Sequence, residues 1–234
     1  MYHWIMKRVW IMSRNICLIV QARLSSQRVP HKMIEPLGTK SLFEIMCEKL
    51  SRPKTISPKD IFVSVYEDEL IQIAQKYYLN IHKRSKESAY FDGDGSVSVM
   101  YDWWDKLPYD YAVLVSPCLP FLRLDTIEGF YNHFKTIDKN GLLGVIERKT
   151  YYWDENKKLI TKKFEKSGNM NTKVVETTYE AAHCLYGGKM SSIGDGIWMG
   201  DFTKDEIDLY PIDESECFDV DYKWQMDYAK KLLE

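Results

Sequence analysis

The sequence predicts an α/β fold with a parallel sheet between two layers of helices. Short apolar runs, which are typical of buried strands, lie at residues 16–20, 60–65, 79–82 and 111–115. Segments with apolar residues at helical spacing lie between them, at 41–50 and 66–78. Strands that alternate with helices in this way favour a three-layer arrangement with right-handed crossovers.

The later elements follow from caps and periodicity. A helix is predicted at 96–107, where the Ser96 hydroxyl can cap the first free N–H groups. A second is predicted at 124–134, with Asp125 and Thr126 in its first turn. Further strands are predicted at 142–146, 181–186 and 217–222, followed by an amphipathic helix at 223–233.

The stretch 149–175 has a different pattern, because it is long, charged and only weakly periodic. It contains three consecutive aromatic residues, Tyr151 to Trp153, and two turn signals around Asn156 and Gly168. A structureless loop of this length would be unusual in a compact domain. We therefore predict a pair of β-strands that projects from the sheet, with a mobile surface flap as the alternative.

Composition limits the function classes. The chain has 234 residues, a net charge of −2 and 45% hydrophobic residues, so it predicts one globular domain without non-specific nucleic-acid binding. Five scattered cysteines without CxxC spacing indicate neither zinc nor a disulfide framework, which fits a reducing cytoplasm.

Residues 1–14 are apolar with interspersed cations and are too short to span a bilayer. We predict an N-terminal extension there, with Met12 as an equally plausible start and an amphipathic surface helix as the alternative. The main domain is predicted at residues 15–234, and no membrane span is expected.

The polar stretch after the first strand carries the clearest functional signal. Arg23, Arg28 and Lys32 follow the strand closely, with the hydroxyls of Ser25 and Ser26 between them. Open α/β sheets bind ligands at the carboxyl ends of their strands. Three cations on one loop repel one another unless an anion lies among them, and phosphate is the commonest such anion. The alternative is a solvated basic loop.

A second signal lies near the carboxyl end of the chain. In a strand, Asp219 and Asp221 would point to the same face. Carboxylates that share a face repel each other, so a divalent cation is a natural explanation for the pair. The alternative is a solvated turn whose acids cap the following helix.

The loop also carries a family resemblance. The spacing Ala22-Arg23-x-x-Ser26-x-Arg28-x-Pro30-x-Lys32, followed by Leu37-Gly38, resembles the signature loop of cytidylyltransferases that activate acidic sugars. These are the CMP-acylneuraminate synthetases and their CMP-Kdo and spore-coat polysaccharide relatives. The sequence departs from the sialic-acid enzymes at Gln21 and Ser41, where they often carry Pro, and Gln21 is familiar from the spore-coat branch.

The resemblance implies a set of site residues. Arg23, Arg28 and Lys32 would hold the β- and γ-phosphates of CTP, and Mg²⁺ would bind Asp219 and Asp221. Catalysis would depend on Arg23, Lys32 and Asp221. The base would be read partly by main-chain groups near Ala22. The implied nucleotide-binding residues are Ala22, Arg23, Ser26, Arg28, Lys32, Arg84, Ser85 and Asp94, with Asp92 as the alternative to Asp94.

The resemblance also implies the fold and the reaction. It implies a Rossmann-like nucleotide-diphospho-sugar transferase fold in a cytoplasmic homodimer whose subunits meet through the excursion at 147–180. The enzyme would transfer CMP from CTP to an acidic, nonulosonic-type sugar for surface polysaccharide or glycan synthesis, with release of pyrophosphate. His183, in the predicted strand 181–186, could contact substrate, although a single histidine in an apolar strand more often belongs to the core.

Three departures from the family keep alternatives open. The turn 116–121 lacks the metal-binding Asp of the Kdo and spore-coat branches, and the Arg-x-Asn-Gly that usually precedes strand 181–186 is missing. Gln225 stands where an acid is usual. The alternatives are a cytidylyltransferase for a phosphonate or phosphorylated alcohol, and a non-catalytic nucleotide-binding homologue.

Overall fold

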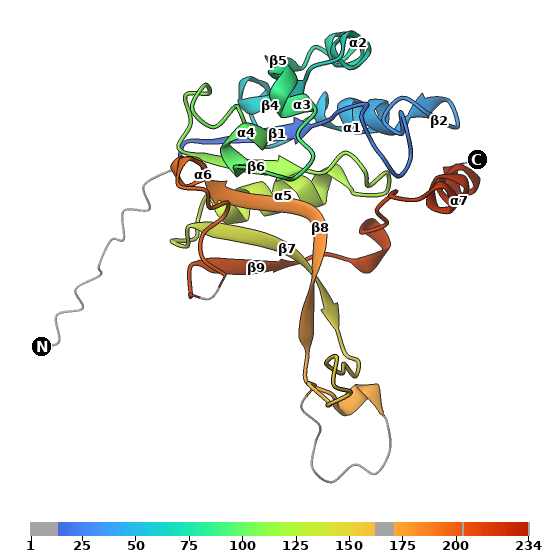
Figure 1. The fold of residues 1–234 in the computed structure, drawn as a ribbon, viewed down its shortest axis with the longest axis vertical. Coiled ribbons are helices and arrows are strands. Elements are labelled where there is room, and N and C mark those ends of the chain that lie inside the picture. The colour runs from blue at the N-terminus through green and yellow to red at the C-terminus, as the bar shows by residue number, and fades with distance from the viewer. Residues whose placement is uncertain (1–13, 162–170, 203, 234) are drawn as a thin grey trace, which may run out of the picture.

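The computed structural model describes residues 14–161, 171–202 and 204–233, and its centre is a seven-stranded sheet (Figure 1). Across the sheet the strand order is β5-β4-β1-β6-β8-β7-β9. The strands are β1 Ile16–Gln21, β4 Ile61–Val65, β5 Asn80–Lys83, β6 Tyr111–Val115, β7 Gly141–Arg148, β8 Thr178–Lys189 and β9 Ile207–Pro211.

The strand directions correct the expectation of a purely parallel sheet. β1 pairs in parallel with β4 and β6, and β4 pairs in parallel with β5, as the alternating pattern predicts. β8 is antiparallel to both β6 and β7. The sheet is therefore mixed. β9, which pairs in parallel with β7, has no counterpart in the sequence prediction.

Helices and short turns connect these strands. The α-helices are α1 Leu42–Leu50, α2 Asp68–Lys76, α3 Lys86–Ala89, α4 Val97–Met100, α5 Leu124–Phe134, α6 Ser191–Gly194 and α7 Lys223–Leu233. A small hairpin joins β2 Pro36–Leu37 to β3 Lys40–Ser41, and single 3₁₀ turns lie at η1 Pro58–Asp60, η2 Thr172–Val174 and η3 Glu214–Glu216.

Two apolar clusters, one on each face of the sheet, confirm the three-layer α/β fold. Alternate residues of β1 divide between them: Leu18 and Val20 pack with α1, α2 and α5, whereas Cys17 and Ile19 pack with Trp103 and α6. Both sets are fully buried or nearly so, which explains why β1 reads as a continuous apolar run.

Two predicted elements are wrong in extent. The helix expected at 96–107 ends at Met100, because Asp102 and Trp103 turn inward and hydrogen-bond to other elements. Ser96 does cap this shorter helix, accepting a hydrogen bond from the Ser98 N–H. The segment 217–222 contains no strand, although both of its aspartates reach the same cavity.

An arm projects from the sheet where β7 and β8 run on past their neighbours (Figure 1). Beyond these strands only an isolated antiparallel bridge, Trp153 to Leu159, was found in the described part of the excursion, so the predicted strand pair is not a continuous ladder there. Residues 162–170 of the excursion, and residues 1–13 of the predicted extension, lie outside the described residues. Arg14 lies with the domain, over the rings of Tyr111 and Phe134.

The segment that carries both aspartates is tied to α5 through Glu216. This carboxylate is 3% exposed and accepts hydrogen bonds from the Arg123 N–H at 2.8 Å, from Arg123 Nε at 2.9 Å and from Thr126 Oγ1 at 2.9 Å. These donors lie at the N-terminus of α5, where a carboxylate is also favoured by the helix dipole. Glu216 therefore fixes η3, and with it the start of the segment that leads to Asp219.

We expect Glu216→Gln to lower the free energy of unfolding by about 1.5–3 kcal/mol, because buried charge-assisted hydrogen bonds are lost. Glu214→Gln is the matched control in the same turn. Its side chain is 67% exposed and pairs with Arg148, so its loss should stay under about 1 kcal/mol. Chemical denaturation of both variants measures the difference, and equal losses would contradict the anchoring role of Glu216.

Candidate active site

A cavity of about 930 Å³ lies at the carboxyl ends of β1 and β6. The chain leaves β1 toward β4 on one side and later adds β6 on the other side, so this is the point where the strand order reverses. Open α/β sheets bind ligands at such a point. The cavity is lined by the loop after β1, by Ser116 to Cys118 after β6, by His183 and Tyr186 of β8, and by Asp219 and Asp221.

The loop after β1 is held in place by other elements. The Leu24 N–H donates to Glu67 Oε1 at 2.9 Å, and Ser25 Oγ donates to the Ala89 carbonyl at 3.2 Å. His31 adopts a left-handed conformation, with φ of 58°, as the loop turns back toward α1. Arg23, Arg28 and Lys32 thereby all line the cavity, as the sequence predicts for a loop that gathers its cations.

Asp221 is the counterion of the two cations that lie farther along this loop. Its Oδ1 lies 3.0 Å from Lys32 Nζ, and its Oδ2 lies 2.8 Å from Arg28 Nη2. Lys32 is buried and also donates to the Val220 carbonyl at 3.0 Å. Burial alone would lower the pKa of Lys32, but the neighbouring Cys118 and Asp221 raise it above its ordinary value. Lys32 is therefore charged at neutral pH.

Asp219 has the opposite environment. Its Oδ1 is buried without a hydrogen-bond partner within the described residues. Burial, together with repulsion from Asp221, raises the pKa of Asp219 above its ordinary value. An orphaned carboxylate oxygen beside a second carboxylate, both on one cavity, is a donor set of the kind that Mg²⁺ prefers.

Asp219 and Asp221 fit a Mg²⁺ site that also uses ligands from a substrate better than a site whose ligands all come from the protein. Among residues 14–161, 171–202 and 204–233, no group of three or more His, Cys, Asp or Glu side chains could hold an ion. Magnesium is usually bound by one or two carboxylates together with substrate phosphates and water. Asp219 and Asp221 therefore fit a metal that arrives with a phosphate ligand.

The backbone at Asp221 is fixed by Gln225 of α7. Gln225 Oε1 accepts hydrogen bonds from the N–H groups of Asp221 and Tyr222, both at 2.7 Å. The side chain thus satisfies free donors at the N-terminus of the helix, which an acid could also do. Gln225, where the resembled family usually has an acid, therefore holds the backbone between Asp221 and α7.

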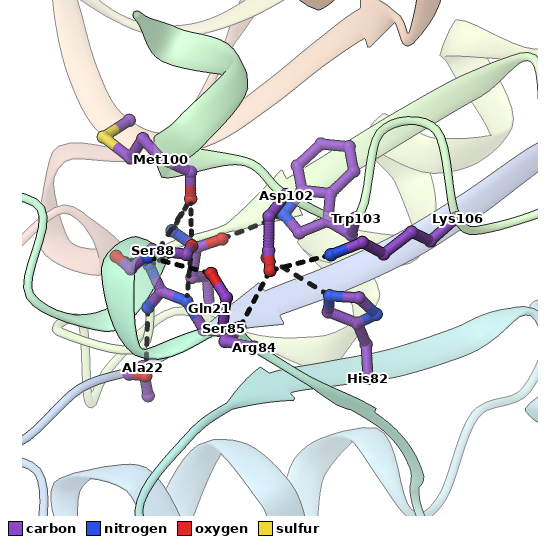
Figure 2. Close-up of polar contacts among 10 residues, drawn as sticks. All are labelled: Gln21, Ala22, His82, Arg84, Ser85, Ser88, Met100, Asp102, Trp103 and Lys106. Atoms are coloured by element: carbon purple, nitrogen blue, oxygen red, sulfur yellow. Dashed lines mark hydrogen bonds and ion pairs between the residues drawn. The ribbon is translucent and has the colours of Figure 1, made fainter. Parts of the chain in front are cut away.

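Arg84 is not among the residues that line the cavity. Figure 2 shows its guanidinium directed at Ala22, Ser88 and Met100. It is 4% exposed and donates to the carbonyls of Ala22, Ser88 and Met100. Arg84 is predicted to contact the nucleotide; in the structure its donors bind these carbonyls and it lies outside the lining residues, so the contact stays a prediction. The main-chain groups of Ala22 are also engaged, since its N–H donates to the Ser64 carbonyl at 3.1 Å.

Asp102 joins three further elements (Figure 2). It lies 3.2 Å from His82 Nε2, accepts from the Ser85 N–H at 2.9 Å and pairs with Lys106 Nζ at 3.1 Å. Burial would raise the pKa of Asp102, but these contacts hold it well below its ordinary value. Ser85, predicted to contact the nucleotide, instead caps α3 through its hydroxyl and lies outside the lining residues.

Gln21, where the sequence departs from the sialic-acid enzymes, is fixed within the cavity wall. Its amide accepts a hydrogen bond from Trp103 Nε1 at 2.9 Å and donates to the Met100 carbonyl at 3.2 Å (Figure 2). Sequence reasoning missed this network, because Trp103 lies in a stretch whose periodicity indicates helix. The inward turn of residues 101–103 is a tertiary effect without a local signal.

His183 is exposed on the cavity, so the interpretation of this histidine as a core residue is wrong. The register between β7 and β8 shifts from Leu143–Tyr186 to Val145–Ala181, which leaves His183 in a bulge with φ of 53°. Bulges re-aim side chains and are common beside active sites. His183 Nδ1 lies 3.2 Å from Tyr186 Oη, and both side chains line the cavity.

The structure distinguishes the two aspartates of the turn after α3. Asp92 lines the cavity, whereas Asp94 lies outside the lining and uses its N–H to bind Asp92 Oδ1 at 3.1 Å. This geometry favours Asp92 as the nucleotide contact. Ser26 also lines the cavity, where its Oγ accepts weakly from the Val29 N–H at 3.4 Å.

We expect Asp92→Asn to weaken CTP binding at least about tenfold, since a charged acceptor on the cavity is lost. Asp94→Asn removes the same charge two residues away and should change the Kd less than about twofold. Isothermal titration calorimetry with CTP and Mg²⁺ measures both. A loss confined to the Asp94 variant would contradict the assignment to Asp92.

Comparisons with known proteins agree with this geometry. Residues 17–128 match the family model described as cytidylyltransferase. No curated protein matches the sequence significantly. Among solved structures, CMP:2-keto-3-deoxy-manno-octonic acid synthetase complexed with CTP superposes with a TM-score of 0.65 at 9% identity, over 94% of this chain and 98% of that chain.

Two other solved structures have the same fold. A cytidylyltransferase from Leptospira borgpetersenii has a TM-score of 0.63 at 14% identity, over 93% of this chain and 85% of that chain. The 4-diphosphocytidyl-2C-methyl-D-erythritol synthase from Anaerococcus prevotii has a TM-score of 0.63 at 14% identity, over 95% and 97%. At such identities these likenesses show the fold alone. The family model matches residues 17–128, just under half of the chain, and this part is similar to a cytidylyltransferase, in agreement with the resemblance that the first loop carries.

Proposed function

We propose that this cytidylyltransferase transfers CMP from CTP to an acidic sugar of the nonulosonic type and releases pyrophosphate. One observation carries the proposal: the cavity at the ends of β1 and β6 brings the cations of the first loop against the two carboxylates before α7. The reaction needs this pair of opposite charges, since a triphosphate requires cations and the attacked phosphorus requires charge neutralisation.

The cations would bind the part of the nucleotide that leaves. Arg23, Arg28 and Lys32 line one cavity and would hold the β- and γ-phosphates, so that pyrophosphate departs from a positively charged surface. An acceptor hydroxyl would attack the α-phosphorus in line from the opposite side. In such a reaction the protein acts mainly by positioning the reactants and by stabilising charge.

The carboxylates would hold a magnesium ion. Asp219 and Asp221 supply hard oxygen ligands, and Asp219 has an oxygen without a partner among the described residues. When bound there, Mg²⁺ would neutralise charge on the α-phosphate and lower the pKa of the attacking hydroxyl. Lys32 and Arg28 would then orient the triphosphate, and Gln225 would keep the backbone of Asp221 in place.

Two other functions remain candidates. The acceptor could be a phosphorylated alcohol or a phosphonate, because the Arg-x-Asn-Gly of the sugar side is missing from the sequence. The fold is compatible with either acceptor, since a CMP-Kdo synthetase and a diphosphocytidyl-methylerythritol synthase both share it. A non-catalytic nucleotide-binding protein is the third candidate, and it predicts CTP binding without turnover.

Pyrophosphate release with a panel of acceptors separates the three functions. We expect release from CTP with an acidic nonulosonic sugar and Mg²⁺, and little release from ATP, GTP or UTP. Lys32→Met should abolish it, whereas Lys40→Met, which affects a partly exposed lysine paired with Glu48, should not. Turnover with a phosphorylated alcohol alone would replace the sugar, and tight CTP binding without turnover on any acceptor would favour the non-catalytic candidate.

A homodimer is the second part of the proposal. The arm exposes large apolar side chains, notably Trp153 at 52% and Ile160 at 62%. Exposed aromatic and aliphatic side chains on a projecting segment are poorly suited to solvent and typical of subunit contacts. The arm would then bring the excursion of one subunit toward the other.

Light scattering at micromolar concentration tests the assembly. We expect twice the chain mass, and a shift toward the monomer for Trp153→Ser, because a buried aromatic contact would be lost. Tyr78→Ser is the control, since Tyr78 is 96% exposed and lies outside the arm. A monomer for the unmodified protein at this concentration would remove the subunit-contact role of the arm.

A further inference from the structure

We infer that Asp221 blocks the phosphate-binding cations in the free protein, so that tight binding of a triphosphate requires a divalent cation to take over Asp221. The inference rests on the proposed function, because it concerns the same cavity and the same substrate. It adds that binding of the divalent cation and binding of the triphosphate are coupled through Asp221. Its basis is the set of contacts that Asp221 and its neighbours make.

Both carboxylate oxygens of Asp221 are in use. Oδ1 accepts from Lys32 Nζ at 3.0 Å, and Oδ2 pairs with Arg28 Nη2 at 2.8 Å. The Lys32 side chain is only 10% exposed and its second hydrogen bond goes to the Val220 carbonyl. An ammonium group has three donors, so at most one donor of Lys32 is left for a phosphate oxygen.

The local charges also balance. The cavity is lined by three cations, Arg23, Arg28 and Lys32, and by three carboxylates, Asp92, Asp219 and Asp221, so its charges cancel when all of them are ionised. A triphosphate therefore meets a cluster without net positive charge, next to a buried carboxylate oxygen of Asp219 that has no partner among the described residues. A phosphate bound beside Asp219 would be repelled by its carboxylate, and burial of that carboxylate strengthens the repulsion.

A divalent cation reverses this balance. Bound between Asp219 and Asp221, it would change the charge of the cluster from zero to +2 and free the donors of Lys32 and Arg28. The backbone N–H of Asp221 is held by Gln225 at 2.7 Å, so only the carboxylate needs to change partners. By linkage, if the cation strengthens triphosphate binding, the triphosphate strengthens cation binding by the same factor.

The test measures binding and not turnover. Isothermal titration calorimetry with inorganic tripolyphosphate in EDTA is carried out on the unmodified protein, Asp221→Asn and Asp219→Asn. We expect Asp221→Asn to bind at least tenfold more tightly than the unmodified protein. Asp219→Asn removes the same charge from the same cavity. Because Asp219 pairs with neither Lys32 nor Arg28, this variant should gain less than threefold in affinity for tripolyphosphate.

One further variant and one further condition complete the design. Asp227 is an exposed carboxylate on α7 that pairs with Lys223. Asp227→Asn therefore controls for loss of a charge outside the cavity, and it should leave the Kd for tripolyphosphate unchanged. Thermal unfolding checks that each variant is folded. If Asp221→Asn is not folded, the unmodified protein decides, and its Kd for tripolyphosphate should tighten at least tenfold when Mg²⁺ replaces EDTA.

The outcomes separate this inference from the proposed function. Equal or weaker metal-free binding by folded Asp221→Asn overturns the inference, as does an equal gain in Asp219→Asn. If Asp221→Asn does not fold, the inference is overturned when the unmodified protein binds tripolyphosphate equally well in EDTA and in Mg²⁺. None of these binding results tests the proposed cytidylyltransferase activity, which is measured by turnover of CTP. Failure of CTP to bind under any condition would instead contradict the proposed function itself.

Discussion

The ion pair between the buried Lys32 and the partly buried Asp221 is the constraint on which the site depends. The two residues are 189 positions apart, so the contact joins the loop after β1 to a segment near the other end of the chain. A buried ammonium without a counter-charge would be strongly destabilising, which ties the loop after β1 to the segment before α7. Glu35 adds a second tie between the same regions, because Lys223 and Lys230 both lie 2.9 Å from its Oε1.

The sequence predicts the elements whose signals are local. β1, β6, α5 and α7 have the bounds that apolar periodicity, caps and breakers indicate, to within a residue. The cations of the first loop could also be placed, because a polar loop after a buried strand must emerge at one edge of the sheet. Asp219 and Asp221 reach the cavity without the predicted strand, because the backbone there is held by Gln225 and by the Val220 N–H, which donates to the Cys118 carbonyl at 3.0 Å.

The rest of the site depends on long-range contacts that the local sequence pattern does not predict. Arg84 reads as a ligand-binding residue in a polar loop, yet its donors are used by carbonyls of three separate segments. The helix expected after Ser96 stops because the side chains of Asp102 and Trp103 have partners elsewhere. His183 faces the cavity only because β8 bulges where it leaves β6 for the arm.

The family match covers one side of the cavity and not the other. The matched residues 17–128 include the loop after β1 and the turn after β6, which form the side of the cavity that carries the cations. His183, Tyr186, Asp219 and Asp221 form the other side, and they lie outside the matched range. In the proposed reaction the acceptor hydroxyl would approach the α-phosphorus opposite the leaving pyrophosphate, and therefore from this second side. In that case the residues that select the acceptor would lie on β8 and in the segment before α7, where a bulge and long-range contacts, and not a sequence motif, place the side chains.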